Sequence, residues 1–491
     1  MLSLPQHPFI IQRSANKIHH PQMRLFFVLF ILAVAFIGTI LFFIRGYAKL
    51  PKALPNETAL PSPDWVKDAI IYEVFVRNFS AEGTFKALEA RLPELRDLGV
   101  SVIWLMPIHP IGKIKRKGTF GSPYSVQDYL ALDSLYGTKE DFKSLVAAVH
   151  AQGMKIILDM VLNHTAWDNE LISTHPDFYR RNKNGEIVSP NDDWTDVADI
   201  NYNNPEVRQY MKNVMLYWIL EYDVDGFRCD VAELIPTEFW TESLRELRRV
   251  KPSLMLLSEG TLPEHHVAGF DLTYSWTIYD ALTKILKGKD NALLLHDLLE
   301  KEEKVFPKNS LRMRFNTNHD KNAYDGTPQV HFGSKTAAQL TAALVFTLGG
   351  YGTIRSVPML YNGDEVGSPT RISLFEKTPI DWNTPDAGEW KQFYKRLIAL
   401  RQTEPALTRG TMTKLRTSND EAVFAFERQH QDSRVIVAAN LSKTPFNGFV
   451  KTEPNKTLIE VWNAEKQLQT KDGNLKLTLE PLEFKIWKMK D

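Results

Sequence analysis

The sequence of 491 residues lacks features that would have pointed to several common classes of protein. It has one cysteine, Cys229, so no internal disulfide can form and cysteine usage does not identify the compartment. It has no surplus charge of either sign, because 59 lysines and arginines balance 59 aspartates and glutamates. A balanced charge gives no support to a nucleic-acid partner.

Metal-binding motifs and repeats are also missing from the sequence. No HExxH motif or cysteine–histidine cluster predicts a transition-metal site, and no internal repeat or low-complexity tract is present. What is there is a composition of 43% hydrophobic and 11% aromatic residues. That composition favours a large folded core, and the length fits one large barrel with additions.

The N-terminus carries an apolar run at residues 25–44, with the sequence LFFVLFILAVAFIGTILFFI. It contains no charge and is bracketed by Arg24 and Arg45. About twenty apolar residues span a bilayer core of about 30 Å, whereas the apolar part of a signal peptide is shorter, at about 7–15 residues. We therefore predict an uncleaved transmembrane helix over 25–44, preceded by an N-terminal tail over 1–24.

Basic residues flank this apolar run on both sides in nearly equal number. The positive-inside rule counts only those residues. We expect a cytoplasmic N-terminus, with the body of the protein outside the cytoplasm, either periplasmic or extracellular. Residues 45–63 hold four prolines after position 50 and are predicted to form an extended linker.

From 64 to 405, apolar β-branched runs alternate with segments of helical period. The predicted strands are 70–76, 100–105, 155–161, 226–229, 255–258, 270–273, 313–315 and 358–361. The predicted helices are 85–98, 139–152, 206–221, 237–249, 279–286, 335–348 and 390–402. Eight buried strands interleaved with helices predict an α/β fold, a (β/α)8 TIM barrel.

Two stretches depart from the barrel pattern. Residues 164–203, after the third strand, are polar and rich in Asn, Asp and Trp, and we predict a short excursion over the barrel mouth. After 405 the pattern changes to alternating residues and turns, so 406–491 are predicted to form a C-terminal β-sandwich of antiparallel strands.

Candidate catalytic residues gather at the ends of two neighbouring predicted strands. On the strand 226–229, Arg228 and the following Asp230 share one side, and Cys229 faces the other as a buried structural thiol. A guanidinium beside a carboxylate keeps that carboxylate ionised. Glu259 ends the next strand, and glycoside cleavage needs such a pair of carboxylates, one as nucleophile and one as acid.

Two more polar segments end predicted strands of the same barrel: Asp159-Met-Val-Leu-Asn163-His164 ends the third and Asn318-His319-Asp320 the seventh. Taken singly, a strand-end aspartate often caps a helix or turn, and a loop histidine is often surface. Function gathers at the carboxyl ends of barrel strands, so their joint placement favours one catalytic site.

These four segments, in this order and spacing, resemble the conserved regions of the α-amylase family of glycoside hydrolases. Further matching segments are 99–107 (GVSVIWLMP), 198–201 (ADIN) and 359–365 (MLYNGDE). The resemblance runs from about Trp65 to the C-terminus. It implies a retaining hydrolase that cleaves α-glucosidic bonds, above all α-1,4 bonds, in maltooligosaccharides or starch-type glucans.

The resemblance also implies a role for each candidate residue. Asp230 would attack the anomeric carbon, and Glu259 would act first as acid and then as base. Asp320 would be a third carboxylate that grips sugar hydroxyls. The residues expected to bind substrate or order the pocket are Tyr124, His164, Arg228, His319 and Asp159.

Physical reasoning supports the division of labour between the two carboxylates. Two like charges close together cannot both ionise easily, so the pKa of one of them rises. We expect Arg228 to keep Asp230 charged, which leaves Glu259 as the proton carrier.

The segments depart from the family pattern next to the nucleophile. Glu233 and Leu234 stand where many α-amylases have a Lys-His pair that grips substrate and helps bind calcium. Asn163 and Asp199 still match calcium ligands in kind, so a structural Ca²⁺ is an expectation, although the excursion is short for the rest of the cage. The chemistry itself is expected to need no cofactor. The expected partners are an α-glucan and a lipid bilayer.

Two other functions remain open on the sequence. A 4-α-glucanotransferase of the same family would use the same catalytic residues and pass the glucosyl unit to a second sugar. The heavy subunits of amino-acid transporters combine a membrane span with a non-catalytic amylase-like domain. The filled catalytic positions, and the lack of a cysteine just after the predicted span, oppose that second alternative.

Overall fold

A computed structural model of the chain describes residues 52–462, 465 and 467–490. The predicted tail, transmembrane helix and first part of the linker lie outside the described residues, so the helix over 25–44 stays a prediction. Within the described ranges, no helix is both long enough and apolar enough to cross a bilayer. Residues 52–491 group into one compact unit.

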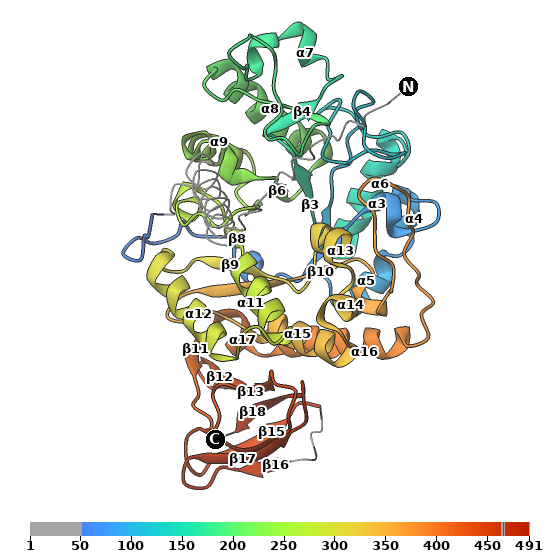
Figure 1. Ribbon diagram of the computed structural model, residues 1–491. Helices are drawn as coiled ribbons and strands as arrows, with labels where there is room; N and C mark the ends of the chain where they lie inside the picture. The colour runs from blue at the N-terminus through green and yellow to red at the C-terminus, as the bar shows by residue number, and fades with distance from the viewer. Residues whose placement is uncertain (1–51, 463–464, 466, 491) are drawn as a thin grey trace, which may run out of the picture. The chain divides into compact units, whose positions relative to one another are not determined.

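Parallel strands close into a barrel with the neighbour order β1-β10-β9-β8-β7-β6-β3-β2 (Figure 1). The strands are β1 (Ile71–Val74), β2 (Val102–Leu105), β3 (Lys155–Met160), β6 (Gly226–Cys229), β7 (Met255–Ser258), β8 (Leu272–Tyr274), β9 (Leu311–Arg314) and β10 (Arg355–Tyr361). The predicted (β/α)8 barrel is confirmed. β6 and β7 begin and end at the predicted residues, and the other strands differ by up to three residues at an end.

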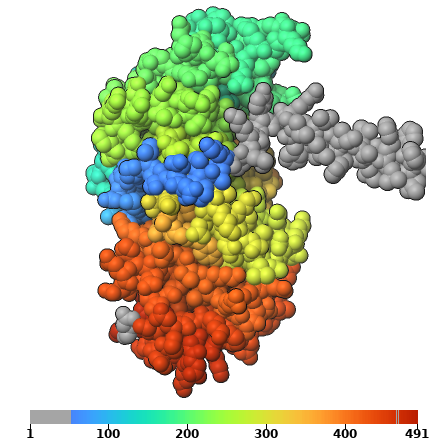
Figure 2. Space-filling view, turned by 90° about the vertical axis from the view of Figure 1, so that its left-hand side faces the viewer, coloured from blue at the N-terminus to red at the C-terminus, as the bar shows by residue number. Residues whose placement is uncertain are grey.

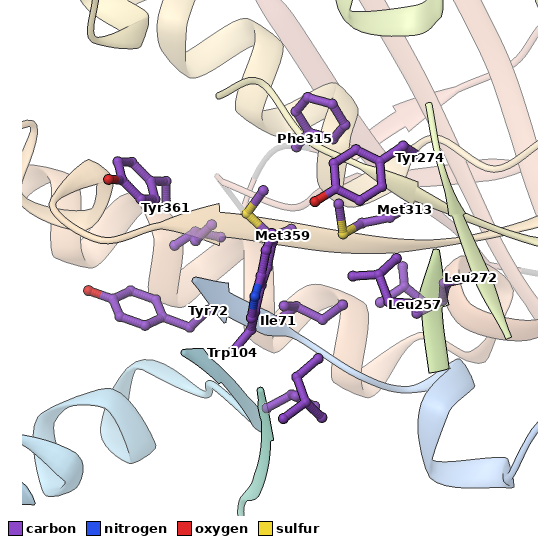
Figure 3. Close-up of a cluster of buried hydrophobic side chains, with 14 of the residues drawn as sticks. Ile71, Tyr72, Trp104, Leu257, Leu272, Tyr274, Met313, Phe315, Met359 and Tyr361 are labelled. Carbon is purple, nitrogen blue, oxygen red and sulfur yellow. The ribbon is translucent and has the colours of Figure 1, made fainter. Parts of the chain in front are cut away.

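The strand register decides which side chains enter the barrel. Glu73 lies opposite Trp104, and Asp159 lies opposite Arg228. Alternate residues of a strand point to the same face, so these side chains share the interior with apolar ones. Figure 3 shows part of that apolar filling: Leu257, Leu272, Tyr274, Met313 and Met359. The charged residues therefore belong to the inner face of the sheet, near the carboxyl ends of the strands.

Helices follow the strands around the barrel. The longer ones are α5 (Leu92–Leu98), α6 (Lys139–Ala151), α8 (Pro205–Tyr222), α9 (Thr237–Val250), α11 (Trp276–Leu286), α12 (Leu293–Val305), α15 (Lys335–Thr347) and α16 (Ala387–Thr403). The other helices are α2 (Asp64–Lys67), α3 (Val76–Phe79), α4 (Phe85–Glu89), α10 (His265–Ala268), α13 (His319–Asp325), α14 (Pro328–Phe332) and α17 (Pro405–Arg409).

Besides the short helices, which were not predicted apart from α4, the helices differ from the prediction mainly at two places. The single helix expected over 85–98 is split into α4 and α5, because Pro93 has no N–H to bond to the preceding turn and stands instead at the start of α5. The sequence analysis did not predict α12, whose buried residues include Leu295, Leu299 and a charged one, Glu302.

Residues 164–203 leave the barrel after β3 as an excursion. It contains the antiparallel pair β4 (His164–Ala166) and β5 (Val197–Asp199), with α7 (Leu171–Thr174) and η1 (Pro176–Phe178) between them. The loop between β2 and α6 holds it in place, because Lys117 Nζ lies 3.0 Å from Asp196 Oδ1. Figures 1 and 2 show the excursion and the C-terminal strands at opposite ends of the barrel.

The C-terminal part is antiparallel, as predicted. One sheet has the order β11-β12-β13-β18-β15-β16, and a second pairs β14 with β17. The strands are β11 (Thr411–Lys414), β12 (Val423–His430), β13 (Ser433–Asn440), β14 (Phe446–Lys451), β15 (Thr457–Glu460), β16 (Gln467–Gln469), β17 (Asn474–Leu479) and β18 (Phe484–Lys490). A small apolar core joins the two sheets. The domain limits proposed from the sequence stay a prediction.

Arg428 ties the C-terminal sheet to the barrel. Its side chain is fully buried and donates hydrogen bonds to the carbonyl oxygens of Thr347, Leu407 and Gly410, at 2.8, 3.1 and 3.1 Å. Thr347 ends α15, and Leu407 lies in α17. The guanidinium therefore satisfies carbonyls near the ends of helices, which have no partner within the helix.

The outer face of β9 buries two more guanidiniums against α12. Arg314 Nη2 lies 2.6 Å from Glu302 Oε2, and Arg312 Nε lies 3.3 Å from Glu302 Oε1. Burial alone would raise the pKa of Glu302, but the charges of Arg314 and Arg312 overcome it and hold that pKa below its usual range. This carboxylate is therefore ionised at neutral pH.

Candidate active site

One buried guanidinium joins three carboxylates at the mouth of the barrel. Arg228 Nη1, from β6, lies 2.8 Å from Asp159 Oδ1 and 2.8 Å from Asp230 Oδ1. Its Nη2 lies 2.7 Å from Glu259 Oε2. The three acids come from the carboxyl ends of β3, β6 and β7, as the sequence analysis expected of one site. The guanidinium is completely buried, which strengthens these charge interactions.

The backbone after Asp230 makes a direct contact with the second candidate catalytic carboxylate. Val231 has φ 36° and ψ 44°, a left-handed conformation that a β-branched residue adopts only under strain. In this conformation its N–H donates to Glu259 Oε2 at 2.7 Å. The turn after the candidate nucleophile thus positions the candidate acid directly.

The contact between Arg228 and Glu259 corrects one expectation. We expected the guanidinium to favour the charge on Asp230 alone and leave Glu259 as the proton carrier, whereas it contacts both carboxylates. Burial raises the pKa of Asp230 to about 6 and that of Glu259 to about 7, with Arg228 opposing both rises. The repulsion between Asp230 and Glu259 adds to the rise at Glu259. Burial, mutual repulsion and the contact with Arg228 therefore give the two carboxyl groups different pKa values.

His319, Tyr124 and Asp320 lie on the other side of the same pocket. His319 Nε2 is 2.8 Å from the Tyr124 hydroxyl and 3.5 Å from Asp320 Oδ2, and the rings of His319 and Tyr124 stack at 5.2 Å between centroids. The Tyr124 hydroxyl also donates to Asp159 Oδ2 at 3.1 Å. Asp320 is the more open of the acids, with its side chain 35% exposed.

His164 belongs to the excursion side of the site. It is buried, its ring lies 5.6 Å from that of Trp194, and burial lowers the pKa of its imidazole to about 4. A neutral imidazole offers one N–H and one acceptor nitrogen to a sugar hydroxyl. Cys229 is buried as expected, and burial raises the pKa of its thiol, which makes it unreactive.

The structure adds three residues that the sequence analysis did not select: Glu73, Trp104 and Tyr274. Glu73 Oε1 lies 2.5 Å from His319 Nδ1, Tyr274 accepts a hydrogen bond from Arg228 Nε at 3.3 Å, and the Trp104 ring lies 5.4 Å from the Arg228 guanidinium. A charged residue within the apolar run Ile70–Val74 was the signal for Glu73. No comparable signal marks the two aromatic residues.

The two expected calcium ligands do not form a cation site. Asp199 Oδ2 lies 3.4 Å from Arg180 Nε, and the side-chain nitrogen of Asn163 faces His164 Nδ1 at 3.4 Å. Over the part of the chain that the structure describes, no group of three or more His, Cys, Asp or Glu residues could hold a metal ion. A guanidinium already supplies positive charge to Asp199, so these residues do not fit calcium and no step below uses it.

Comparison with known proteins matches both parts of the chain to family models. The one described as "Alpha amylase, catalytic domain" matches residues 67–386, and "Maltogenic Amylase, C-terminal domain" matches residues 412–486. Among relatives, Alpha-amylase 3 of Dictyoglomus thermophilum is 26% identical over 82% of this chain and 91% of its own length. The maltogenic α-amylase of Bacillus acidopullulyticus is 26% identical over 87% of this chain and 78% of its own.

Solved structures agree with these matches. The crystal structure of a noncanonic maltogenic α-amylase from Thermotoga neapolitana superposes with a TM-score of 0.78 at 32% identity, covering 86% of this chain and 99% of that one. An α-amylase from Lactobacillus plantarum gives a TM-score of 0.76 at 29% identity, covering 86% and 99%. The likeness thus covers the barrel together with the C-terminal sheets.

Proposed function

The chain belongs to the α-amylase family of glycoside hydrolases, and from this premise we propose that it cleaves α-1,4-glucosidic bonds of maltooligosaccharides or starch-type glucans with retention at the anomeric carbon. The observation that carries the proposal is the buried Arg228, which joins Asp230 and Glu259 at the ends of adjacent strands. A retaining glycosidase needs one ionised and one protonated carboxyl group in this arrangement.

The proposed reaction has two steps. In the first, an Asp230 oxygen attacks the anomeric carbon, the bond to the leaving oxygen breaks, and Glu259 gives that oxygen its proton. In the second, Glu259 takes a proton from water, the water oxygen attacks the anomeric carbon, and the bond to Asp230 breaks. Glu259 ends protonated and Asp230 ionised, so the site is restored.

The electrostatics of the pocket support this assignment of roles. Burial raises the pKa of Glu259 further than that of Asp230, to about 7 against about 6. The higher pKa of Glu259 favours it as the proton carrier of the pair. Because the two groups interact, the measured values will belong to the pair.

The remaining polar residues are proposed to hold the sugar. Asp320 is open enough to accept hydrogen bonds from sugar hydroxyls, and Tyr124 presents an aromatic ring beside it. His164 and His319 are proposed as donors to the same sugar, and Asp159 orders Arg228 and Tyr124 without touching substrate.

The N-terminal residues complete the proposal from the sequence alone. We propose that residues 25–44 anchor the enzyme in a membrane by a single span, with the catalytic part outside the cytoplasm. A protease-protection assay on intact cells or spheroplasts tests the orientation. If the protease digests the barrel only after the membrane is permeabilised and the cytoplasm is exposed, the proposed orientation is wrong.

The test of the reaction uses the full chain in a mild detergent with maltoheptaose, panose, pullulan and trehalose. We expect α-configured products in the first NMR spectra, and abolished turnover in both Asp230→Asn and Glu259→Gln, which keep the size of each side chain. Products of β configuration would contradict retention. Normal hydrolysis by either variant would refute the assignment of that residue, and transfer products in excess of glucose and maltose would favour the glucanotransferase.

A further inference from the structure

Glu73 is a buried carboxylate to which the proposed reaction gives no role. It lies on β1, its side chain has no exposed area, and the register places it in the same inner layer as Trp104. Its Oε1 is 2.5 Å from His319 Nδ1, and its Oε2 accepts the backbone N–H of His319 at 3.3 Å. Both oxygens of one strand residue are therefore directed at one histidine.

The hydrogen bonds around His319 determine where its protons lie. The Tyr124 hydroxyl has one hydrogen and two neighbours, Asp159 Oδ2 at 3.1 Å and His319 Nε2 at 2.8 Å. Burial raises the pKa of Asp159 to about 6, against the charge of Arg228 at 2.8 Å, so at pH 7 this carboxyl is mostly ionised and accepts. Tyr124 must give its hydrogen to Asp159, and its oxygen is then free to accept one from His319 Nε2.

The same reasoning applies to the second ring nitrogen. Glu73 accepts the backbone N–H of His319 with one oxygen and faces Nδ1 with the other, so an ionised Glu73 requires a hydrogen on Nδ1 as well. With hydrogens on both nitrogens, the ring is a cation. A neutral imidazole keeps both short contacts only if Glu73 itself carries the proton, and the titration of His319 distinguishes the two placements.

We propose that Glu73 is a positioning residue that holds His319 as an imidazolium ion, with its Nε2–H directed into the pocket toward Tyr124, Asp320 and the bound sugar. The proposal rests on the proposed function for its effect on catalysis, but the charge of His319 can be measured without substrate. The proposal gives Glu73 of β1 a role in the site, although the proposed reaction places no residue of that strand at the scissile bond.

The charges around the pair are consistent with this assignment. Burial would lower the pKa of His319, but the charges of Asp320 and Glu73, with the hydrogen bond to Glu73, overcome it and raise that pKa to about 9. Arg228 opposes the rise from β6, and Asp159 lies beyond Tyr124. On the far side, Tyr361 and Asp364 of the β10 end also face Glu73.

A permanent imidazolium suits the proposed role better than a neutral ring. A charged donor makes a hydrogen bond about twice as strong as a neutral one, and it cannot turn into an acceptor within the working pH range. Because β1 is a barrel strand and not a loop, the donor is held in place before substrate arrives.

The first test measures the charge of His319 by NMR in the full chain labelled at the histidine Cε1 carbon. The signal is assigned by its loss in His319→Asn and followed from pH 5 to pH 10. We expect an imidazolium signal at pH 7 that titrates near pH 9, and in Glu73→Gln a pKa lower by at least about one unit, because Gln keeps an acceptor but not the charge. A wild-type His319 that is neutral at pH 7 would refute the proposal.

A matched control lies in the same barrel. His150 Nε2 is 2.7 Å from the buried Asp225, which precedes β6 at the opposite ends of the strands. His150→Gln removes this second carboxylate–histidine pair. We expect it to leave both the His319 titration and the turnover of maltoheptaose unchanged within about twofold. A shift of His319 in this variant would show that the titration reports general destabilisation.

The second test follows turnover of maltoheptaose by the same variants. We expect Glu73→Gln to lower kcat by about ten- to a hundredfold with little change in KM, as for the loss of a charged hydrogen bond strengthened in the transition state. The double variant Glu73→Gln/His319→Asn should be no slower than His319→Asn alone, because Glu73 acts through His319. Losses that multiply would refute action through His319.

Together the two tests separate this proposal from the proposed function. If no α-glucoside is cleaved, the reaction assigned above is wrong, but the titration still decides the charge of His319. If hydrolysis proceeds normally and Glu73→Gln changes neither titration nor kcat, the positioning role alone is refuted.

Discussion

The inner and outer faces of the barrel sheet each bury a cluster of guanidiniums and carboxylates, in opposite proportions. Inside, one arginine, Arg228, contacts three acids. Outside, Arg312 and Arg314 share the single acid Glu302. Both clusters are almost completely out of solvent, so the difference lies in the ratio of charges and not in burial.

The ratio decides whether a cluster can exchange protons. Where acids outnumber guanidiniums, burial and repulsion raise carboxyl pKa values to about 6 and about 7, within the range where an enzyme works. Where guanidiniums outnumber acids, the pKa of Glu302 falls below its usual range, and the acid stays ionised. The first arrangement suits catalysis, and the second holds α12 against β9.

The largest effect should come from removing the shared cation of the inner cluster. Arg228→Met leaves three buried carboxylates without a partner and is expected to lower kcat/KM on maltoheptaose by about a thousandfold or more. Arg228→Lys should be nearly as poor, because one ammonium group cannot reach three acids in the geometry of a guanidinium. Near-UV circular dichroism at pH 5.5 shows whether each variant is folded. A folded variant within tenfold of the wild type would contradict the proposed clamp.

Removing the shared anion of the outer cluster should affect stability and leave catalysis intact. Glu302→Gln leaves two buried guanidiniums unpaired and should lower the free energy of unfolding by about 3 kcal/mol at pH 7. Because the folded pKa of Glu302 is depressed, its contribution is present above the usual value of 4.5 and is lost as pH falls through the folded value. Urea unfolding curves of wild type and variant should therefore converge at acid pH. A changed kcat would contradict the separation of the two faces.

Among the described residues, another buried guanidinium, Arg428, bonds only to carbonyl oxygens and to no carboxylate. Arg428→Met removes the donor to the Thr347 and Gly410 carbonyl oxygens, whereas Leu407 keeps Arg401 Nη1 at 3.0 Å, and it is expected to lower the free energy of unfolding by about 2 kcal/mol, with kcat unchanged. The comparison variant is Arg434→Met on the neighbouring strand, where the arginine is 9% exposed and pairs with Glu427 and with the half-exposed Glu453. That change should cost less than about 1 kcal/mol. Equal losses would show that burial of Arg428 adds nothing.

The smallest effect is the pH dependence of the wild-type enzyme. Below about 6 the pair gains a second proton and above about 7 it loses its last one, so kcat/KM should fall on both sides. One unit beyond either limit, the loss approaches tenfold. Glu302→Gln should reproduce this profile, because its acid lies outside the barrel. A profile that moves in this variant would show that the two clusters are coupled.

Much of the barrel could be predicted from the sequence because its strands are short, apolar and separated by helices of clear period. The boundaries of β6 and β7 followed directly, since Gly226 and Ser258 stand where the apolar runs begin and end. α12 was missed, because its buried Glu302 interrupts the apolar face. Glu302 can be buried because it pairs with Arg312 and Arg314, which lie on the strand that follows this helix.

The part of the candidate site that lies at the carboxyl ends of strands could be predicted from the sequence. Asp159, Arg228, Asp230 and Glu259 meet as expected, since the carboxyl ends of parallel strands share one edge. Two facts depended on three-dimensional contacts: that Arg228 also binds Glu259, and that Glu73 reaches His319 across 246 positions of sequence. The roles of these residues remain predictions until the variants are measured.

The strained turn at Val231 has a consequence for how this enzyme could be improved in the laboratory. Glycine adopts φ 36° without strain, so Val231→Gly relieves the turn, while the added freedom of the unfolded chain offsets part of that gain. The same exchange would free the turn to rotate and carry its N–H away from Glu259. Directed evolution for stability would thus be drawn toward a position that sets the catalytic geometry, and selection for activity at every round would be needed to keep the valine.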